Sequence, residues 1–160
     1  MLHKGTDQNV IDVANTIRSA RTSLGLTKPT LAERAGVSVH AVWEVENRNN
    51  GTVALLSALC TALDVRFAGL PRGRGFGEQA RKLRVRRGWS QDRLAERAGV
   101  SAPVIARLEQ GNARIATLTA VLAVLAPKAR VAQSVGRQWS GSAIEIVDLP
   151  LSTSLIAFTP

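Results

Sequence analysis

The hydrophobic positions near the start of the chain recur at the spacing of an α-helix. They lie three or four residues apart, which places them on one helix face, and are Val10, Val13, Ile17, Ala20 and Leu24. The apolar run 53–63 has a similar spacing and predicts a second core helix. Residues 69–77 contain four Gly and one Pro, a composition typical of a linker between domains.

The chain contains an internal duplication. The octapeptide Leu-Ala-Glu-Arg-Ala-Gly-Val-Ser occurs at 31–38 and again at 94–101. An identical string of this length at one offset indicates a repeated structural unit. Weaker matches at the same offset pair Arg21 with Arg84, Gly25 with Gly88, Thr27 with Ser90, Val42 with Ile105, Glu46 with Glu109 and Leu55 with Leu118.

Each copy of the octapeptide carries the signals of two short helices joined by a tight turn. A hydroxyl residue, Thr27 or Ser90, is placed to cap the first helix. Gly36 or Gly99 then ends that helix, and a serine two residues later caps the second. Two short helices joined by a turn with a glycine form a helix-turn-helix, whose second helix enters the DNA major groove.

The surroundings of the second octapeptide fit a wider pattern, Arg84-x-x-x-Gly88-Trp89-Ser90-Gln91-x-x-Leu94-Ala95-x-x-Ala98-Gly99-Val100-Ser101-x-x-x-Ile105-x-x-x-Glu109-x-Gly111-x-x-Arg114. This pattern resembles the λ-repressor/Cro-like, or XRE-family, helix-turn-helix domains. The resemblance covers roughly residues 9–70 and 77–128. It implies an all-α fold with two tandem domains of this kind.

We therefore expect four segments, which are the first domain at 1–70 (repeat one), a Gly/Arg linker at 71–76, the second domain at 77–128 (repeat two) and a C-terminal tail at 129–160. In the tail, 143–149 is β-branched and weakly alternating, which predicts a strand, and 152–158 is a candidate for a second strand. A lone hairpin is marginal in water. The tail therefore pairs with another chain, packs on a domain, is disordered or is a truncated remnant, and these alternatives stay open.

The resemblance also implies which residues face DNA. In the family, the first residue of the first motif helix contacts a phosphate, and this residue is Gln91 in repeat two and Lys28 in repeat one. The start of the second helix and the next turn read bases, and the following loop touches the DNA backbone. These positions are Ser101, Ala102, Pro103, Arg107, Asn112 and Arg114 in repeat two, and Ser38, Val39, His40 and Glu44 in repeat one.

Arg107 is the sharpest candidate for base readout, because Arg can bond guanine O6 and N7 together. A phosphate contact or a free surface position is the alternative. The pairs Arg21 with Glu46 and Arg84 with Glu109 match a structural ion pair of the family that ties the first helix to the end of the third. We expect these four residues to position helices rather than to act catalytically.

Repeat one departs from the family pattern on its second motif helix. Glu44 stands where repeat two has Arg107, and Trp43 occupies a position that is usually exposed. Three interpretations follow. Glu44 can accept a hydrogen bond from cytosine N4 and so read DNA. Alternatively, repeat one no longer reads DNA and uses Trp43 and Val39 for protein contact, or Trp43 is a core residue.

The net charge of +9 is unevenly distributed. Residues 1–70 carry seven Lys or Arg and six Asp or Glu, whereas residues 71–160 carry fourteen and six. Many of the basic residues, Arg86 and Arg87 among them, lie in the linker and the first helices of repeat two. Such a block is the electrostatic footprint of a polyanion partner. A solvated basic face is the alternative.

The sequence lacks the signals of a disulfide-bonded protein, a metal-binding protein, an enzyme or a membrane protein. The single cysteine, Cys60, lies in an apolar run and is expected in the core, with no intrachain disulfide. We find no metal-ligand spacing, nucleophile–base pair or phosphate loop, and therefore predict no enzyme activity, no metal and no cofactor. Because no run approaches about 18 apolar residues and the start is polar, we expect a cytoplasmic protein that does not bind membranes.

These observations predict a sequence-specific regulator of transcription, a repressor, with double-stranded DNA as its partner. Two units in one chain could mimic the dimer that single-domain relatives form, or a homodimer could present four units. One alternative is an antitoxin or anti-activator that binds a protein partner through repeat one or the tail. Another is the DNA-targeting segment of a DNA-modification enzyme.

Overall fold

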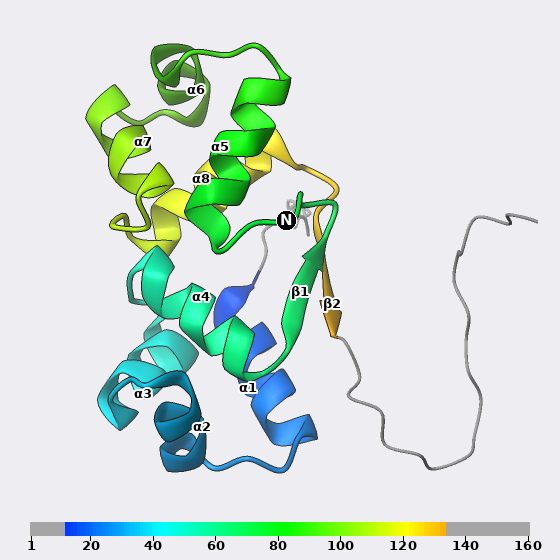
Figure 1. Ribbon diagram of the computed structural model, residues 1–160. Coiled ribbons are helices and arrows are strands. Elements are labelled where there is room, and N and C mark those ends of the chain that lie inside the picture. Colours follow the sequence, from blue (N-terminus) through cyan, green and yellow to red (C-terminus); the bar gives the residue numbers. More distant parts are fainter. Residues whose placement is uncertain (1–11, 134–160) are drawn as a thin grey trace, which may run out of the picture.

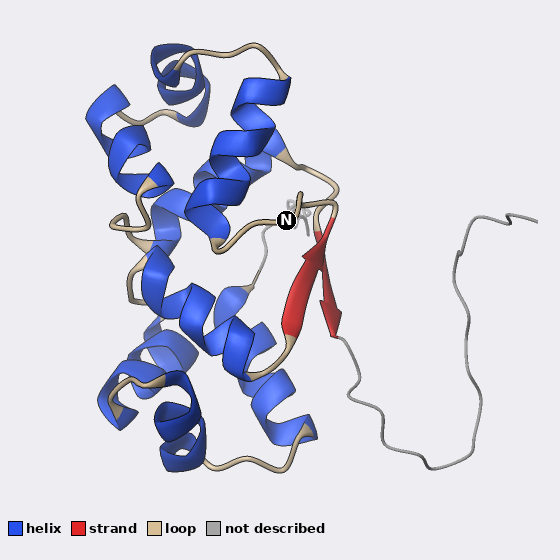
Figure 2. Cartoon of the chain, in the orientation of Figure 1, coloured by secondary structure: helices blue, strands red, loops and turns tan. Residues whose placement is uncertain are grey.

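The computed structural model describes residues 12–133, which fold into helices and one short two-stranded ribbon (Figures 1 and 2). The elements are α1 (Val13–Ser23), α2 (Lys28–Ala35), α3 (Val39–Arg48), α4 (Val53–Ala62), β1 (Val65–Ala68), α5 (Phe76–Arg86), α6 (Gln91–Ala98), α7 (Ala102–Glu109), α8 (Ile115–Leu125) and β2 (Arg130–Gln133). The predicted all-α class is confirmed. The strands predicted at 143–149 and 152–158 lie outside the described residues.

Local sequence signals set the ends of the motif helices. Thr27 and Ser90 are the N-caps of α2 and α6, and each hydroxyl accepts from the backbone N–H three residues further on, at 3.3 and 3.1 Å. Gly36 and Gly99 end these helices with φ of +66° and +68°, a conformation that favours glycine. The predicted caps of α2 and α6 and both glycine turns are therefore confirmed, whereas the predicted serine cap of the next helix forms in repeat one but not in repeat two, where the Ser101 side chain makes no capping bond.

The two halves of the described chain repeat one arrangement of four helices. In the first half α3 packs on α1 and α2, and α2 packs on α4; in the second half α7 packs on α5 and α6, and α6 packs on α8. The pairing of Leu55 with Leu118 is wrong by one position, because Leu56 and Leu118 are the buried residues on equivalent turns of α4 and α8. Repeat one has one residue more than repeat two between the N-cap of its third helix, Ser38 or Ser101, and the start of its last helix, so the offset changes there.

The apolar stripe predicted for the first helix is confirmed in its central part. Val13, Ile17 and Ala20 are buried, whereas Val10 lies outside the described residues. Leu24 was expected on the same face, but it is 47% exposed. It is the C-cap of α1, where the chain turns away from the core, so helical spacing no longer applies.

Two reciprocal backbone contacts join the halves. The N–H of Val53, at the start of α4, donates to the carbonyl of Ala113 at 2.9 Å, and the N–H of Ile115, at the start of α8, donates to the carbonyl of Gly51 at 3.0 Å. Thr52 and Arg114 form an antiparallel bridge between these bonds. β1 and β2 also pair antiparallel. Each half donates one of these hydrogen bonds and accepts the other at equivalent positions. The halves are therefore related by an approximate two-fold axis.

The hydrophobic core is continuous across this axis. Its buried residues come from all eight described helices and from β1. Phe67 of β1 meets Phe76 of α5 edge to face, with ring centroids 5.1 Å apart. α5 begins at Phe76, the last residue of the predicted linker, so that end of the linker is built into the core. β2 lies at the start of the predicted tail and packs back on repeat one through β1.

Candidate nucleic-acid interface

In repeat two, α7 presents one polar edge to solvent. Ile105 and Leu108 are buried against the core and fix the rotation of the helix. Pro103 and Arg107, predicted to read bases, are exposed on the opposite side. Ser101 is the exposed N-cap and makes no side-chain capping bond, so its hydroxyl is not used by the helix. Ala102 is half-buried against the core and offers less surface.

The ion pair predicted in repeat two positions the start of α6. The Arg84 guanidinium donates to both carboxylate oxygens of Glu109, at 2.6 and 3.1 Å, and to the Trp89 carbonyl at 2.7 Å. Hydrogen bonding to Glu109 is the main cause that raises the pKa of Arg84, so the guanidinium stays charged. Gln91 Nε2 donates to Glu109 Oε2 at 2.9 Å, which holds the predicted phosphate-contact side chain beside the end of α7.

The same network exists in repeat one. Arg21 donates to Glu46 at 2.7 and 3.1 Å and to the Leu26 carbonyl at 2.8 Å. Lys28 takes the place of Gln91, with its Nζ 3.9 Å from Glu46 Oε2. Both predicted ion pairs are therefore confirmed as contacts between the first and third helices of their half. In each half they also fix the loop that leads into the first motif helix.

Asn112 and Arg114 lie in the loop that joins α7 to α8, beside the junction of the two halves. The N–H of Asn112 donates to the Arg107 carbonyl at 2.8 Å and closes the turn after α7. Arg114 is exposed and is the N-cap of α8 without a side-chain capping bond. Figure 1 shows this loop between the α2–α3 and α6–α7 pairs, which lie along one edge of the molecule, while the ribbon lies on the opposite edge.

One arginine at the C-cap of α5 and two on α6 gather around the ring of Trp89, a grouping that was not predicted from the sequence. The Arg87, Arg93 and Arg97 guanidinium groups lie 5.0, 5.8 and 4.6 Å from the centre of the Trp89 ring. Arg87 also donates to the last carbonyls of α8, at 2.8 and 3.3 Å, so part of its hydrogen-bonding capacity is structural. Arg86 is exposed. The sequence carries a signal for this grouping, because Arg93 and Arg97 follow Trp89 at successive intervals of four residues.

Residues 76–127 match the family described as helix-turn-helix domain. Repeat two is therefore similar to this family. The match covers α5 to α8 and does not extend to repeat one. No curated protein and no solved structure matches the chain.

The second motif helix of repeat one presents a different surface. The Glu44 carboxylate is paired within the protein, because Arg48 Nη1 lies 3.3 Å and Asn50 Nδ2 lies 2.9 Å from it. The Glu44 side chain is only 14% exposed. Trp43 is 37% exposed, stacks on His40 and has the Arg48 guanidinium 5.1 Å from its ring centre. The interpretation of Trp43 as a core residue is therefore wrong.

The other positions of repeat one are also at the surface. Val39 and His40 are exposed, and the Ser38 hydroxyl caps α3 by accepting from the Ala41 N–H at 3.1 Å.

Cys60 is buried, as predicted, and burial raises its pKa to about 12. No described helix has the length and apolar character needed to cross a membrane. Within residues 12–133, no three His, Cys, Asp or Glu side chains are grouped to hold a metal.

Proposed function

We propose that the chain is a sequence-specific DNA-binding regulator of the λ-repressor/Cro-like class, in which α7 and α3 both face one duplex. The approximate two-fold relation between the halves is the observation that carries this proposal. Single helix-turn-helix domains pair as dimers so that two second helices enter successive major grooves, about 34 Å apart. Here the two-fold relation lies within one chain, through the junction at Thr52 and Arg114 and through the ribbon.

The two half-sites of the proposed operator are unequal. Repeat two offers an exposed Arg107, which suits a guanine, and Arg114 at the central loop. At the position of Arg107, repeat one has Glu44, whose carboxylate is engaged by Arg48 and Asn50. Repeat one therefore contributes shape and apolar contact, through Val39 and Trp43, rather than a charged base contact. The regulatory outcome that we propose is repression, by occupation of a promoter.

A second candidate is a protein-binding role for repeat one, as in an antitoxin or anti-activator. The observation that favours it is the pair of exposed apolar side chains on α3, Val39 at 44% and Trp43 at 37%. Exposed aromatic anchors of this kind are enriched in protein interfaces. Under this alternative α3 does not touch DNA, so the selected DNA site contains one half-site only.

In vitro selection of duplexes by the full chain distinguishes these candidates. We expect two unequal half-sites whose centres are about one helical turn apart. Arg107→Ala should weaken specific binding by about 1–3 kcal/mol and relax one base position in the stronger half-site. Arg66→Ala is the matched control, since Arg66 is an exposed arginine on the ribbon. An unchanged preference with Arg107→Ala would remove the base-reading role, and a single half-site would favour the protein-binding candidate.

A further inference from the structure

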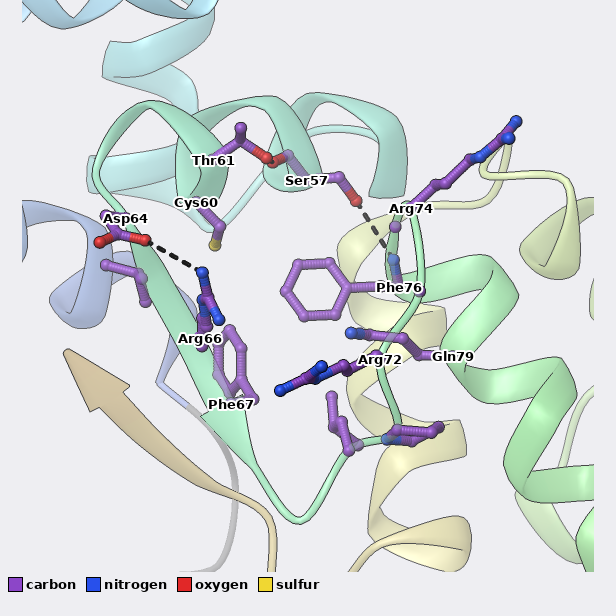
Figure 3. Close-up of a pocket in the computed structure, with 15 residues that line it drawn as sticks. Ser57, Cys60, Thr61, Asp64, Arg66, Phe67, Arg72, Arg74, Phe76 and Gln79 are labelled. Atoms are coloured by element: carbon purple, nitrogen blue, oxygen red, sulfur yellow. Dashed lines mark hydrogen bonds and ion pairs between the residues drawn. The ribbon is translucent and has the colours of Figure 1, made fainter. Parts of the chain in front are cut away.

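A cavity of about 320 Å³ lies where the two halves meet on the ribbon side of the molecule (Figure 3). Its walls come from α4 and β1 of repeat one, from the segment 70–75 and from α5 of repeat two. The volume is within the range of small-molecule sites, about 300–1,000 Å³. The proposed DNA contacts do not use this cavity.

The floor of the cavity suits a flat apolar group. Phe67 and Phe76 are buried and meet at an interplanar angle of 76°, and Figure 3 shows both rings beside the open space. Val65, Leu70 and Pro71 extend the apolar lining. An aromatic ring can therefore pack against these side chains.

The polar part of the lining is cationic. Arg66, Arg72 and Arg74 line the cavity, while Asp64 is its one carboxylate among the described residues and lies 3.7 Å from Arg66. The Arg72 guanidinium forms no hydrogen bond or ion pair with any described side chain or carbonyl, and Figure 3 shows it reaching across the opening toward Phe67. An arginine in this position can bind a carboxylate with two hydrogen bonds.

A buried acceptor adds a second requirement for the ligand. Gln79 Oε1 is buried and has no hydrogen-bond partner among the described residues. Buried polar atoms are nearly always hydrogen-bonded, so a donor that enters the cavity can gain this acceptor when the Gln79 side chain turns toward it. A ligand with an O–H or N–H donor on its ring would satisfy this oxygen.

We infer that the cavity binds a small aromatic carboxylate that carries a hydrogen-bond donor, and that this ligand is an effector of DNA binding. The effector role rests on the proposed function. Because the walls come from both halves, a bound ligand contacts elements on both sides of the junction and biases the placement of α3 relative to α7. The ligand then changes the affinity for DNA by the same factor by which DNA changes the affinity for the ligand.

Ligand binding can be measured without DNA. The probe is 4-hydroxybenzoate, titrated into the full chain and followed by amide NMR shifts, with the uncharged 4-hydroxybenzamide as its matched compound. We expect saturable binding of the acid, shifts centred on the cavity residues and affinity for the amide about tenfold lower. Arg72→Gln should lower the affinity for the acid by about tenfold, whereas Arg81→Gln, an exposed α5 position outside the cavity, should leave it unchanged.

Gln79→Leu tests the need for a hydrogen-bond donor on the ligand separately from the need for its carboxylate. It removes the buried acceptor and should weaken 4-hydroxybenzoate severalfold while leaving benzoate, which lacks the donor, unaffected. Absence of saturable shifts, or equal binding by wild type and Arg72→Gln, would overturn the site.

The effector role is tested on the selected duplex. Saturating 4-hydroxybenzoate should change the DNA dissociation constant of the wild type severalfold and that of Arg72→Gln much less. An unchanged constant in the wild type would overturn the effector role. If no duplex is selected at all, the proposed function fails, while the NMR titration still decides the site.

Discussion

At the scale of single residues, the Arg–Glu pair of each half connects three parts of its domain. In repeat two, Glu109 accepts from Arg84 and from Gln91, and both ion-pair side chains are mostly buried, at 12% and 7% exposure. Arg84 also holds the loop before α6 through the Trp89 carbonyl. The pair therefore fixes the position of α6 relative to α7, which is the geometry on which a helix-turn-helix depends.

Glu109→Ala should lower the free energy of unfolding by about 3–5 kcal/mol, because it leaves the mostly buried Arg84 guanidinium without its carboxylate partner. Urea unfolding of the full chain, followed by tryptophan fluorescence, measures this change. Glu96→Ala is the matched control, since Glu96 is exposed on α6 and should have little effect. A loss below about 1 kcal/mol for Glu109→Ala would mean that the pair behaves as a surface contact.

At the scale of elements, α5 approaches the end of α7 closely enough to need a glycine. A Cβ on Gly77 would collide with the carbonyl oxygens of Leu108 and Glu109. These are backbone atoms of α7 and cannot rotate away. The repeated sequence does not reveal this contact, because repeat one has Ala14 at the corresponding position.

Gly77→Ala should therefore destabilise the chain by about 1–3 kcal/mol, although alanine favours helices, because α5 and α7 must move apart. Thermal unfolding of the full chain measures the effect. The control, Arg81→Ala, changes an exposed position of the same helix and should be close to neutral. An equal or higher melting temperature for Gly77→Ala would show that the two helices tolerate the extra methyl group.

Sequence patterns predicted the elements better than the contacts between the halves. Caps, turns and ion pairs depend on neighbours within one domain, and repetition made them visible. The strands β1 and β2 were not predicted, since each has only four residues and its partner is far away in the chain. The partners of Glu44 were missed because one of them, Asn50, comes from the loop after α3, where helical spacing no longer applies.

At the scale of the whole molecule, the junction places a basic residue between the two motifs. Arg114 bridges to Thr52 through its backbone, and its exposed side chain is free of a capping role. In the proposed complex, in which one duplex spans both halves, we expect this arginine to face the phosphates between the two half-sites. It is therefore a sensitive reporter of the proposed docking geometry.

Arg114→Gln should reduce the slope of log K against log salt by about 0.9, the value for one phosphate contact. Binding of the full chain to the selected duplex at several salt concentrations measures the slope. Arg66→Gln removes the same charge on the ribbon side and should leave the slope unchanged. Equal slopes for both variants and the wild type would place the junction away from the DNA backbone.

The central claim is that one chain, through its internal two-fold arrangement, spans two half-sites. Hydroxyl-radical footprinting of a complex with one chain per duplex tests it most directly. We predict two protected patches on one face of the DNA, their centres about 10 base pairs apart, with the stronger protection on the half-site of repeat two. A single patch with one chain bound, and a second patch only when a second chain binds, would contradict the account.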